Sequence, residues 1–313
     1  MVKRRDYHAY IYLLPAFFLM AVFVLYPVTN TVLTSFKEGY RFLTGSFLLL
    51  SFQNYRMILQ DEIFFRAIFN TSFIAFVCVP FSMLTALVTA LLLNSIKRLK
   101  GYFMTLFYLP QVTNVIAAGM VFALIFNNHF GLINMLLIRI GINPVEWISG
   151  VGIAASKELY LASYLRCLFV LFVYMMWNGL SLKVILFLGG LQNIREDYYM
   201  AARLDGTSKW RILRKITLPL LSPTTFYVFI TSVITAFKAY SQVVALFTTT
   251  YGPAGDNSKM MITVVGYIID ALGSYLSAGS VSVASAAAVL LMIIIMVLTA
   301  LQFKILNRWV HYK

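Results

Sequence analysis

The chain has 313 residues, of which 61% are hydrophobic and only 12% are charged, and its mean hydropathy is +0.83. This composition excludes an ordinary soluble domain and indicates a polytopic membrane protein. The formal charge of +14 would suit a nucleic-acid partner, but the positions of the basic residues account for it as a signal of membrane orientation, so no nucleic acid is expected.

Six apolar runs are long enough to cross a bilayer core, which requires about 20 residues per helix. They cover about residues 12–36, 67–96, 103–126, 159–191, 223–249 and 281–305. The sequence therefore predicts an all-α polytopic membrane protein with six transmembrane helices in a single domain, 1–313. The basic start of the chain leads directly into the first run, which we expect to remain as an uncleaved span.

Lysine and arginine predict the orientation, because cytoplasmic segments carry an excess of them. With the N-terminus inside, fifteen of the 25 basic residues fall in cytoplasmic segments and seven in outer segments. Both termini are therefore expected to be cytoplasmic. The other three basic residues lie within spans: Arg166, Lys183 and Lys238.

The outer segments contain two further helix signals. "SFQNYRMIL", residues 51–59, suits a short interfacial helix, and "HFGLINMLLIRIG", residues 129–141, suits a helix lying flat on the membrane. The three histidines, His8, His129 and His311, all lie outside the apolar runs, so no metal site is predicted.

Residues 196–219 form the longest internal cytoplasmic loop in this topology, and they read as two short helices. The first is expected over about 196–204, ended by Gly206 in the left-handed conformation. Ser208 is expected to cap the second, over 209–216.

Apolar and small residues in this loop indicate a docking surface. Ala201 and Ala202 permit close approach of a partner, and Trp210, Leu213 and Ile216 form an apolar stripe on the second helix. The alternative is an ordinary basic loop that contacts lipid head groups.

The segment "DYYMAARLDGTSKWRILRKITLPLL" resembles the EAA loop, with its E-A-A-x-x-x-G signature, of the permease subunits of ABC importers, most closely the carbohydrate (maltose-type) branch. The flanks "LPQVTNVIAAGMVFALIFNNHFGLINMLL", "FLGGLQNI", "FKAYSQVVALFTTTYGPAG" and "ASAAAVLLMIIIMV" resemble the same branch, so that the resemblance covers roughly residues 10–310. Met200 stands where the family has the Glu of its signature, and one Gly is missing before Pro253. The resemblance implies that this Glu contacts a basic residue on the ATPase subunit. In this chain either Asp197 makes that contact, or the loop relies on Asp205 and on its shape.

The resemblance implies a type I ABC importer permease fold in the bacterial inner (plasma) membrane, surrounded by lipid. It also implies a second permease subunit, two copies of a P-loop ATPase and an extracytoplasmic solute-binding protein. The altered loop favours a heterodimeric pore. This chain has no G-x-x-x-x-G-K-[ST] segment, so it is expected to bind no cofactor and to be no enzyme, with ATP and Mg on the partner ATPase. The residues expected to couple to that ATPase are Asp197, Met200, Ala201, Ala202, Asp205 and Gly206.

Polar residues within the spans are expected to face a water-filled substrate path, since polar groups are costly in lipid. The set comprises Gln111, Asn114, Trp177, Asn178, Gly179, Ser232, Thr235, Lys238, Tyr240 and Gln242. Sugars suit it, because aromatic faces stack on sugar rings while amides and hydroxyls bind their hydroxyl groups. For each polar residue alone, the alternative is a hydrogen bond between helices.

Lys238 lies about 15 residues into the fifth run, too deep for its ammonium to reach the membrane surface easily. It either pairs with a backbone carbonyl or an acid of the partner subunit, or it faces the path and meets an anionic oligosaccharide such as a uronate. Arg166 and Lys183 are instead expected to extend to opposite membrane faces.

Two other classes of transport protein compete with this interpretation. An ion-coupled secondary transporter usually needs an intramembrane acid, and none of the six runs carries one deep inside. A channel is harder to distinguish by residue type, but it has no need of the docking loop.

Overall fold

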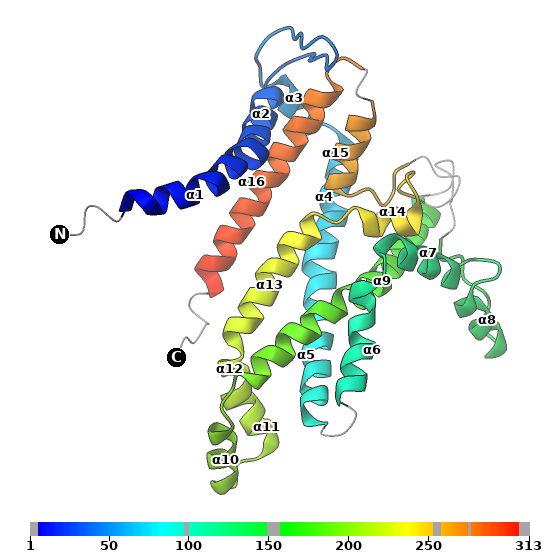
Figure 1. Ribbon diagram of the computed structural model, residues 1–313. Coiled ribbons are helices and arrows are strands. Elements are labelled where there is room, and N and C mark those ends of the chain that lie inside the picture. Colours follow the sequence, from blue (N-terminus) through cyan, green and yellow to red (C-terminus); the bar gives the residue numbers. More distant parts are fainter. Residues whose placement is uncertain (1–5, 97–99, 149–156, 253–257, 275–276, 307–313) are drawn as a thin grey trace. The chain divides into compact units, whose positions relative to one another are not determined.

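The computed structural model describes residues 6–96, 100–148, 157–252, 258–274 and 277–306 (Figure 1). The chain divides into two compact units. The first comprises Met1–Phe64 and Tyr267–Ile293, and the second comprises Phe65–Gly266 and Ile294–Lys313.

Four continuous helical segments are long and apolar enough to cross a membrane: Tyr10–Ser35, Glu62–Ser95, Glu158–Gln192 and Ser280–Ile305. They correspond to the runs expected at 12–36, 67–96, 159–191 and 281–305. Two bent helix pairs bring the possible number of spans to six. The prediction of an all-α membrane fold is therefore confirmed for the part of the chain that the structure describes.

The run expected as one span over 103–126 is broken. It forms α6 (Lys100–Val112) and α7 (Val115–Ile125), which meet at 97°. Asn114 begins α7, because its Oδ1 accepts hydrogen bonds from the backbone N–H groups of Ile116 and Ala117 at 2.9 and 3.2 Å. An asparagine in this capping position satisfies two of the donors that a helix start leaves unpaired, and so stabilises the break.

The run expected as one span over 223–249 is broken as well. Helix α13 (Ser222–Phe237) ends at Lys238, and the chain turns through Tyr240 into the short helix α14 (Ser241–Phe247). At its other end α13 meets the helical segment Lys209–Leu220 at 62°. The polar sequence Lys-Ala-Tyr-Ser-Gln at 238–242 therefore marks a turn between two helices, not the middle of one.

Three π-helical turns occur in the described helices: η1 (Ala21–Leu25), η2 (Ile74–Cys78) and η3 (Leu213–Thr217). Each is followed two residues later by a proline, Pro27, Pro80 or Pro219. Proline has no N–H, and its ring clashes with the carbonyl four residues earlier, which in all three cases lies in the π-helical turn. The widened turn thus accommodates a proline while the helix continues.

The first unit contains α1 (Asp6–Met20), α2 (Tyr26–Ser35), α3 (Gln53–Ile58), most of α15 (Val264–Gly273) and the first half of α16 (Ser280–Leu306). The expected short helix in 51–59 is α3. Asn54 on α3 donates to the backbone carbonyl of Ser35 at 2.8 Å, and Tyr55 shares a 2.6 Å hydrogen bond with the Ser35 hydroxyl. These bonds hold α3 against the end of α2.

The second unit is built on α9 (Lys157–Gln192), the longest helix described. Helix α5 (Val79–Ser95) packs along α9, α6 packs against α9, and α13 packs against η2 and α5. Tyr174 and Leu171 of α9 are fully buried, and the Tyr174 hydroxyl donates to the backbone carbonyl of Val115 at 2.6 Å, which ties α9 to the start of α7. The outer helix expected in 129–141 is α8 (Leu132–Arg139).

Asn70 of α4 (Glu62–Phe73) connects three segments of the second unit. Its Nδ2 donates to the carbonyls of Met260 and Ile262 at 3.1 and 2.8 Å, and its Oδ1 accepts from the Tyr164 hydroxyl at 2.5 Å. Because the side chain is fully buried, losing it leaves these partners unpaired away from water.

Asn70→Leu should therefore lower the melting temperature of the detergent-purified protein, because the free energy of unfolding falls by about 2 kcal/mol. The matched variant Asn70→Asp retains the acceptor for Tyr164 but removes the amide donor, so its melting temperature should fall as well. If Asn70→Leu melts at the parent's temperature, the residue does not hold these segments together.

Candidate functional site

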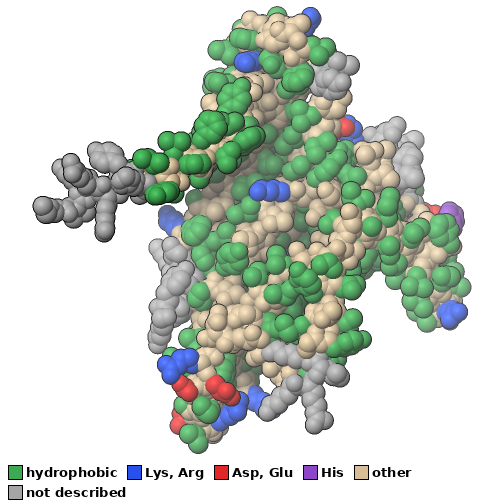
Figure 2. Space-filling view, viewed as in Figure 1, with side chains coloured by type: hydrophobic (Ala, Val, Ile, Leu, Met, Phe, Trp, Pro, Cys, Tyr) green, Lys and Arg blue, Asp and Glu red, His purple; other side chains and the backbone are tan. Residues whose placement is uncertain are grey.

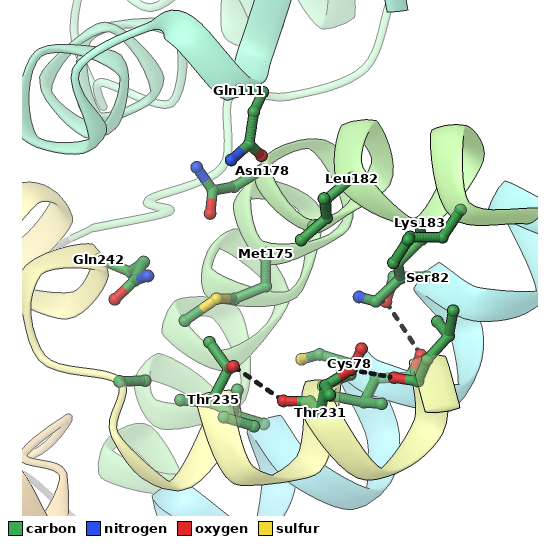
Figure 3. Close-up of a pocket in the computed structure, with 18 residues that line it drawn as sticks. Cys78, Ser82, Gln111, Met175, Asn178, Leu182, Lys183, Thr231, Thr235 and Gln242 are labelled. Atoms are coloured by element: carbon green, nitrogen blue, oxygen red, sulfur yellow. Dashed lines mark hydrogen bonds between the residues drawn. The ribbon is translucent and has the colours of Figure 1, made fainter. Parts of the chain in front are cut away.

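A cavity of about 260 Å³ lies among the helices of the second unit (Figure 3). The walls come from η2 and α5, the end of α6, the middle of α9, and α13 with the start of α14. Six of the ten residues expected along the substrate path line it: Gln111, Asn178, Gly179, Ser232, Thr235 and Gln242. Residues more than 130 positions apart in sequence thus surround one space.

Four of these side chains have polar groups that no described residue engages. Gln111, Asn178, Ser232 and Gln242 make no side-chain hydrogen bond with any other described residue. The alternative of hydrogen bonds between helices is therefore not realised for these four within the described chain. Three amides and a hydroxyl remain able to bind the hydroxyl groups of a ligand.

The packing of α6 on α9 accounts for the position of Gln111 beside Asn178. Ser181 of α9 donates a hydrogen bond to the backbone carbonyl of Phe107 in α6. Gln111 follows one turn later, next to Pro110 within α6. Figure 3 shows the Gln111 and Asn178 amides reaching toward the cavity from these two helices.

The other four expected residues do not line the cavity. Asn114 caps α7, and the Trp177 ring packs on Phe122 with ring centroids 5.4 Å apart. Lys238 is exposed at the end of α13, and the ring of Tyr240 packs toward Tyr251 at 6.4 Å. No aromatic ring is among the described residues that line this space, so the stacking expected from Trp177 and Tyr240 is not placed there.

Lys183 lies in the cavity wall, contrary to the prediction that it extends to a membrane face. The residue is only 8% exposed, and its ammonium donates to the hydroxyl of Ser82 on α5 at 2.6 Å. The α9 helix turns this position toward α5, which the apolar run alone could not indicate. The sequence offered one signal of a buried position: Lys183 lies about nine residues from the end of a 36-residue helix, and so far from the membrane face.

The expected first helix of the 196–219 loop is α10 (Glu196–Leu204), with Glu196 and Asp197 in its first turn. Gly206 follows at φ +65°, and two backbone hydrogen bonds close the end of the helix. The Gly206 N–H donates to the Arg203 carbonyl at 3.1 Å, and the Thr207 N–H donates to the Ala202 carbonyl at 3.0 Å. This is the Schellman arrangement, in which glycine adopts a left-handed conformation that other residues adopt only with strain.

The expected second helix, over 209–216, is helical throughout. It begins as α11 (Lys209–Ile212), widens into the π-helical turn η3 (Leu213–Thr217) before Pro219, and continues to Leu220. Ser208 makes no side-chain capping bond, contrary to prediction; the helix begins with the Ile212 N–H bonded to the Ser208 carbonyl at 3.0 Å.

A groove on this hairpin brings together four of the six residues expected to contact an ATPase: Asp197, Ala201, Ala202 and Asp205. Met200 and Gly206 are not among its described lining residues. Every charged residue between 195 and 215 is exposed, and Figure 2 shows basic and acidic side chains gathered at the place of α10 and α11. Trp210 is 70% exposed and Leu204 is 90% exposed, so apolar surface accompanies the charges.

Comparisons with known proteins agree along almost the whole chain. A family model described as "Binding-protein-dependent transport system inner membrane component" matches residues 79–312. The arabinooligosaccharides transport system permease protein AraP of Bacillus subtilis is 27% identical over 298 residues, which cover 95% of this chain and 87% of the relative. The lactose transport system permease protein LacF of Rhizobium radiobacter is 29% identical over 304 residues, covering 95% and 93%.

A solved structure has a similar fold. A chain in the crystal structure of a bacterial alginate ABC transporter, in complex with alginate pentasaccharide-bound periplasmic protein, matches with a TM-score of 0.78 and 19% identity. The match covers 97% of this chain and 96% of that chain.

Proposed function

Because this chain belongs to the family of binding-protein-dependent transport system inner membrane components, we propose that it forms part of the pore of an ATP-driven importer of sugars or oligosaccharides. The observation that supports sugars as the substrate class is the cavity. Gln111, Asn178, Ser232 and Gln242 present polar groups there that no described residue engages. The relatives AraP and LacF are named for arabinooligosaccharides and lactose, which favours a sugar over an ion as the substrate.

The 196–219 hairpin is the proposed coupling element. Its groove offers Asp197 and Asp205 together with Arg211 and Lys215, and the small residues Ala201 and Ala202 allow a partner close approach. Two copies of a P-loop ATPase, which carry ATP and Mg, would bind there from the cytoplasm. Closure of the ATPases would then move the hairpin and the helices attached to it as near-rigid bodies.

The remaining partners complete the assembly. A second, unlike permease subunit would form the other half of the pore, and an extracytoplasmic binding protein would deliver the sugar. Both termini would be cytoplasmic, because the basic residues concentrate in the segments on that side.

Purification in mild detergent from the native cells, followed by mass spectrometry, tests this proposal. We expect stoichiometric recovery of a P-loop ATPase and a second permease, together with ATP-dependent sugar uptake in proteoliposomes supplied with the binding protein. Recovery of a stable chain without any ATPase would instead support an ion-coupled transporter or a channel.

A further inference from the structure

Lys183 places an unbalanced positive charge on the wall of the cavity. Its ammonium is bonded to the Ser82 hydroxyl, and this is its only hydrogen-bond partner among the described residues. The cavity lining contains no Asp or Glu, and no described carboxylate forms an ion pair with this lysine. The other described lining residues are uncharged, so Lys183 is the one charged side chain among the described residues that line this space.

A buried ammonium is costly unless an anion or several acceptors replace its water. An ammonium has three N–H donors, and only one of them is used here. The Ser82 hydroxyl donates its own proton to the Val79 carbonyl at 2.9 Å, so that toward Lys183 it can only accept. The two remaining donors are available to whatever enters the cavity.

Gly179 provides the space in which the ammonium lies. Gly179 is four residues before Lys183, on the same face of α9, and a Cβ added to it would lie 2.9 Å from Lys183 Nζ. The side chain therefore folds back along the helix over the glycine, instead of extending toward a membrane face. Figure 3 shows Lys183 and Ser82 together at one side of the cavity, with the Gln111, Asn178 and Gln242 amides on other sides.

We propose that Lys183 binds the anionic group of a charged sugar, with a uronic acid carboxylate as the representative ligand, while the amides around it bind the sugar's hydroxyl groups. This inference rests on the proposed function, and it gives Lys183 the role that was one of the two alternatives predicted for Lys238. An N⁺–H···O⁻ hydrogen bond is about twice as strong as a neutral one, so one lysine is enough to favour an anionic group over a neutral one.

The test uses whole cells that express the complete importer with either the parent permease or one variant. Acidic oligosaccharides from pectin and glucuronoxylan and neutral ones from galactan and xylan are supplied together, and internalised sugars are measured by mass spectrometry. Because every strain has the same binding protein, the ratio of variant to parent uptake for each sugar reports on the permease alone. Immunoblots of the membrane fraction correct for the amount of permease.

Lys183→Gln is expected to lower uptake of the acidic sugars at least about tenfold, and of the neutral sugars by no more than about threefold. Lys183→Arg, which keeps the charge, should recover at least part of the acidic uptake. Lys304→Gln is the matched control for the loss of a lysine, since this exposed residue in the last turn of α16 is outside the cavity. Lys238→Gln separates the two lysines, and it should retain the preference for acidic sugars.

Three results would overturn the inference. In the first, Lys183→Gln lowers the uptake of acidic and neutral sugars equally, or it lowers the uptake of neither class. In the second, Lys238→Gln and not Lys183→Gln removes the acidic preference. In the third, the parent imports neutral sugars and no acidic one, and the proposed function then stands without the inference. Failure of the assembled parent to import any sugar would overturn the proposed function itself.

Discussion

Gly206→Val in the hairpin that follows α10 is expected to lower substrate uptake by about tenfold to hundredfold, with the amount of permease in the membrane unchanged. Gly206 has φ +65°, which disfavours residues with a Cβ and β-branched ones most of all. A strain of about 1–3 kcal/mol at one residue would shift the hairpin away from the observed turn. If the hairpin couples to an ATPase, α11 would then be misplaced for docking.

The matched control is Gly206→Asn, because asparagine tolerates the left-handed conformation. No heavy atom of the described residues beyond the chain neighbours lies within 4 Å of a Cβ at this position, so the Cβ of either variant has room and the two differ chiefly in backbone preference. Uptake by Gly206→Asn should remain within about threefold of the parent, measured with a labelled substrate and corrected for permease in the membrane fraction. Equal uptake by the Val variant and the parent would show that the turn is not needed for coupling.

Local rules account for the parts of the fold that the sequence predicted well. The four long apolar runs form continuous helices because each has twenty or more apolar residues, and a π-helical turn accommodates Pro27 and Pro80 where they occur. The end of α10 was predictable for a similar reason: the signal, a glycine two residues after Leu204, acts within its own turn. In both cases the residues that determine the structure are neighbours in sequence.

The breaks at residues 113–114 and 238–240 were harder to predict, because polar residues in an apolar run have two interpretations. Asn114 was assigned to a substrate path, yet its amide oxygen caps the next helix. Lys238 was placed deep in a continuous span, yet it ends α13. Composition averaged over a window does not reveal whether a polar side chain forms hydrogen bonds with its own backbone or with a distant partner.

The cavity itself depends on contacts that are remote in sequence. Ser82 and Lys183 are 101 residues apart, and their hydrogen bond follows from how α5 packs along α9. Polarity in the sequence was enough to predict that Gln111, Asn178 and Gln242 share one space. It gave no sign that Lys183 lines this space while Lys238 is not among its described lining residues, because the direction of a side chain on α9 depends on the helices packed against it.

Gly119→Leu should be the most destabilising of the substitutions considered, because α7 and α14 approach each other backbone to backbone at this glycine. A Cβ on Gly119 would overlap the Cβ of Ala245, and the Ala245 backbone Cα and C atoms would be only 3.2 Å away. Both residues are buried. Small residues permit such close packing of membrane helices, and a backbone cannot move aside as a flexible side chain can.

The leucine would therefore push α14 away from α7, at a cost of about 3 kcal/mol. Gln242 is the second residue of α14, so the displacement would also move an amide of the cavity wall. We expect the melting temperature of the purified protein in detergent to fall by roughly 5 °C or more, and uptake to fall with it.

Exchanging the two small residues provides the decisive control. Gly119→Ala alone adds one methyl group that overlaps Ala245, and Ala245→Gly alone removes a methyl group from the same contact. In the double variant the methyl group moves from α14 to α7, so the overlap of the two Cβ atoms disappears. Its melting temperature should exceed that of Gly119→Ala, which gives a favourable coupling between neighbouring sites in a double-mutant cycle. Additive effects of the two changes would contradict the close approach of α7 and α14, since independent positions show no such coupling.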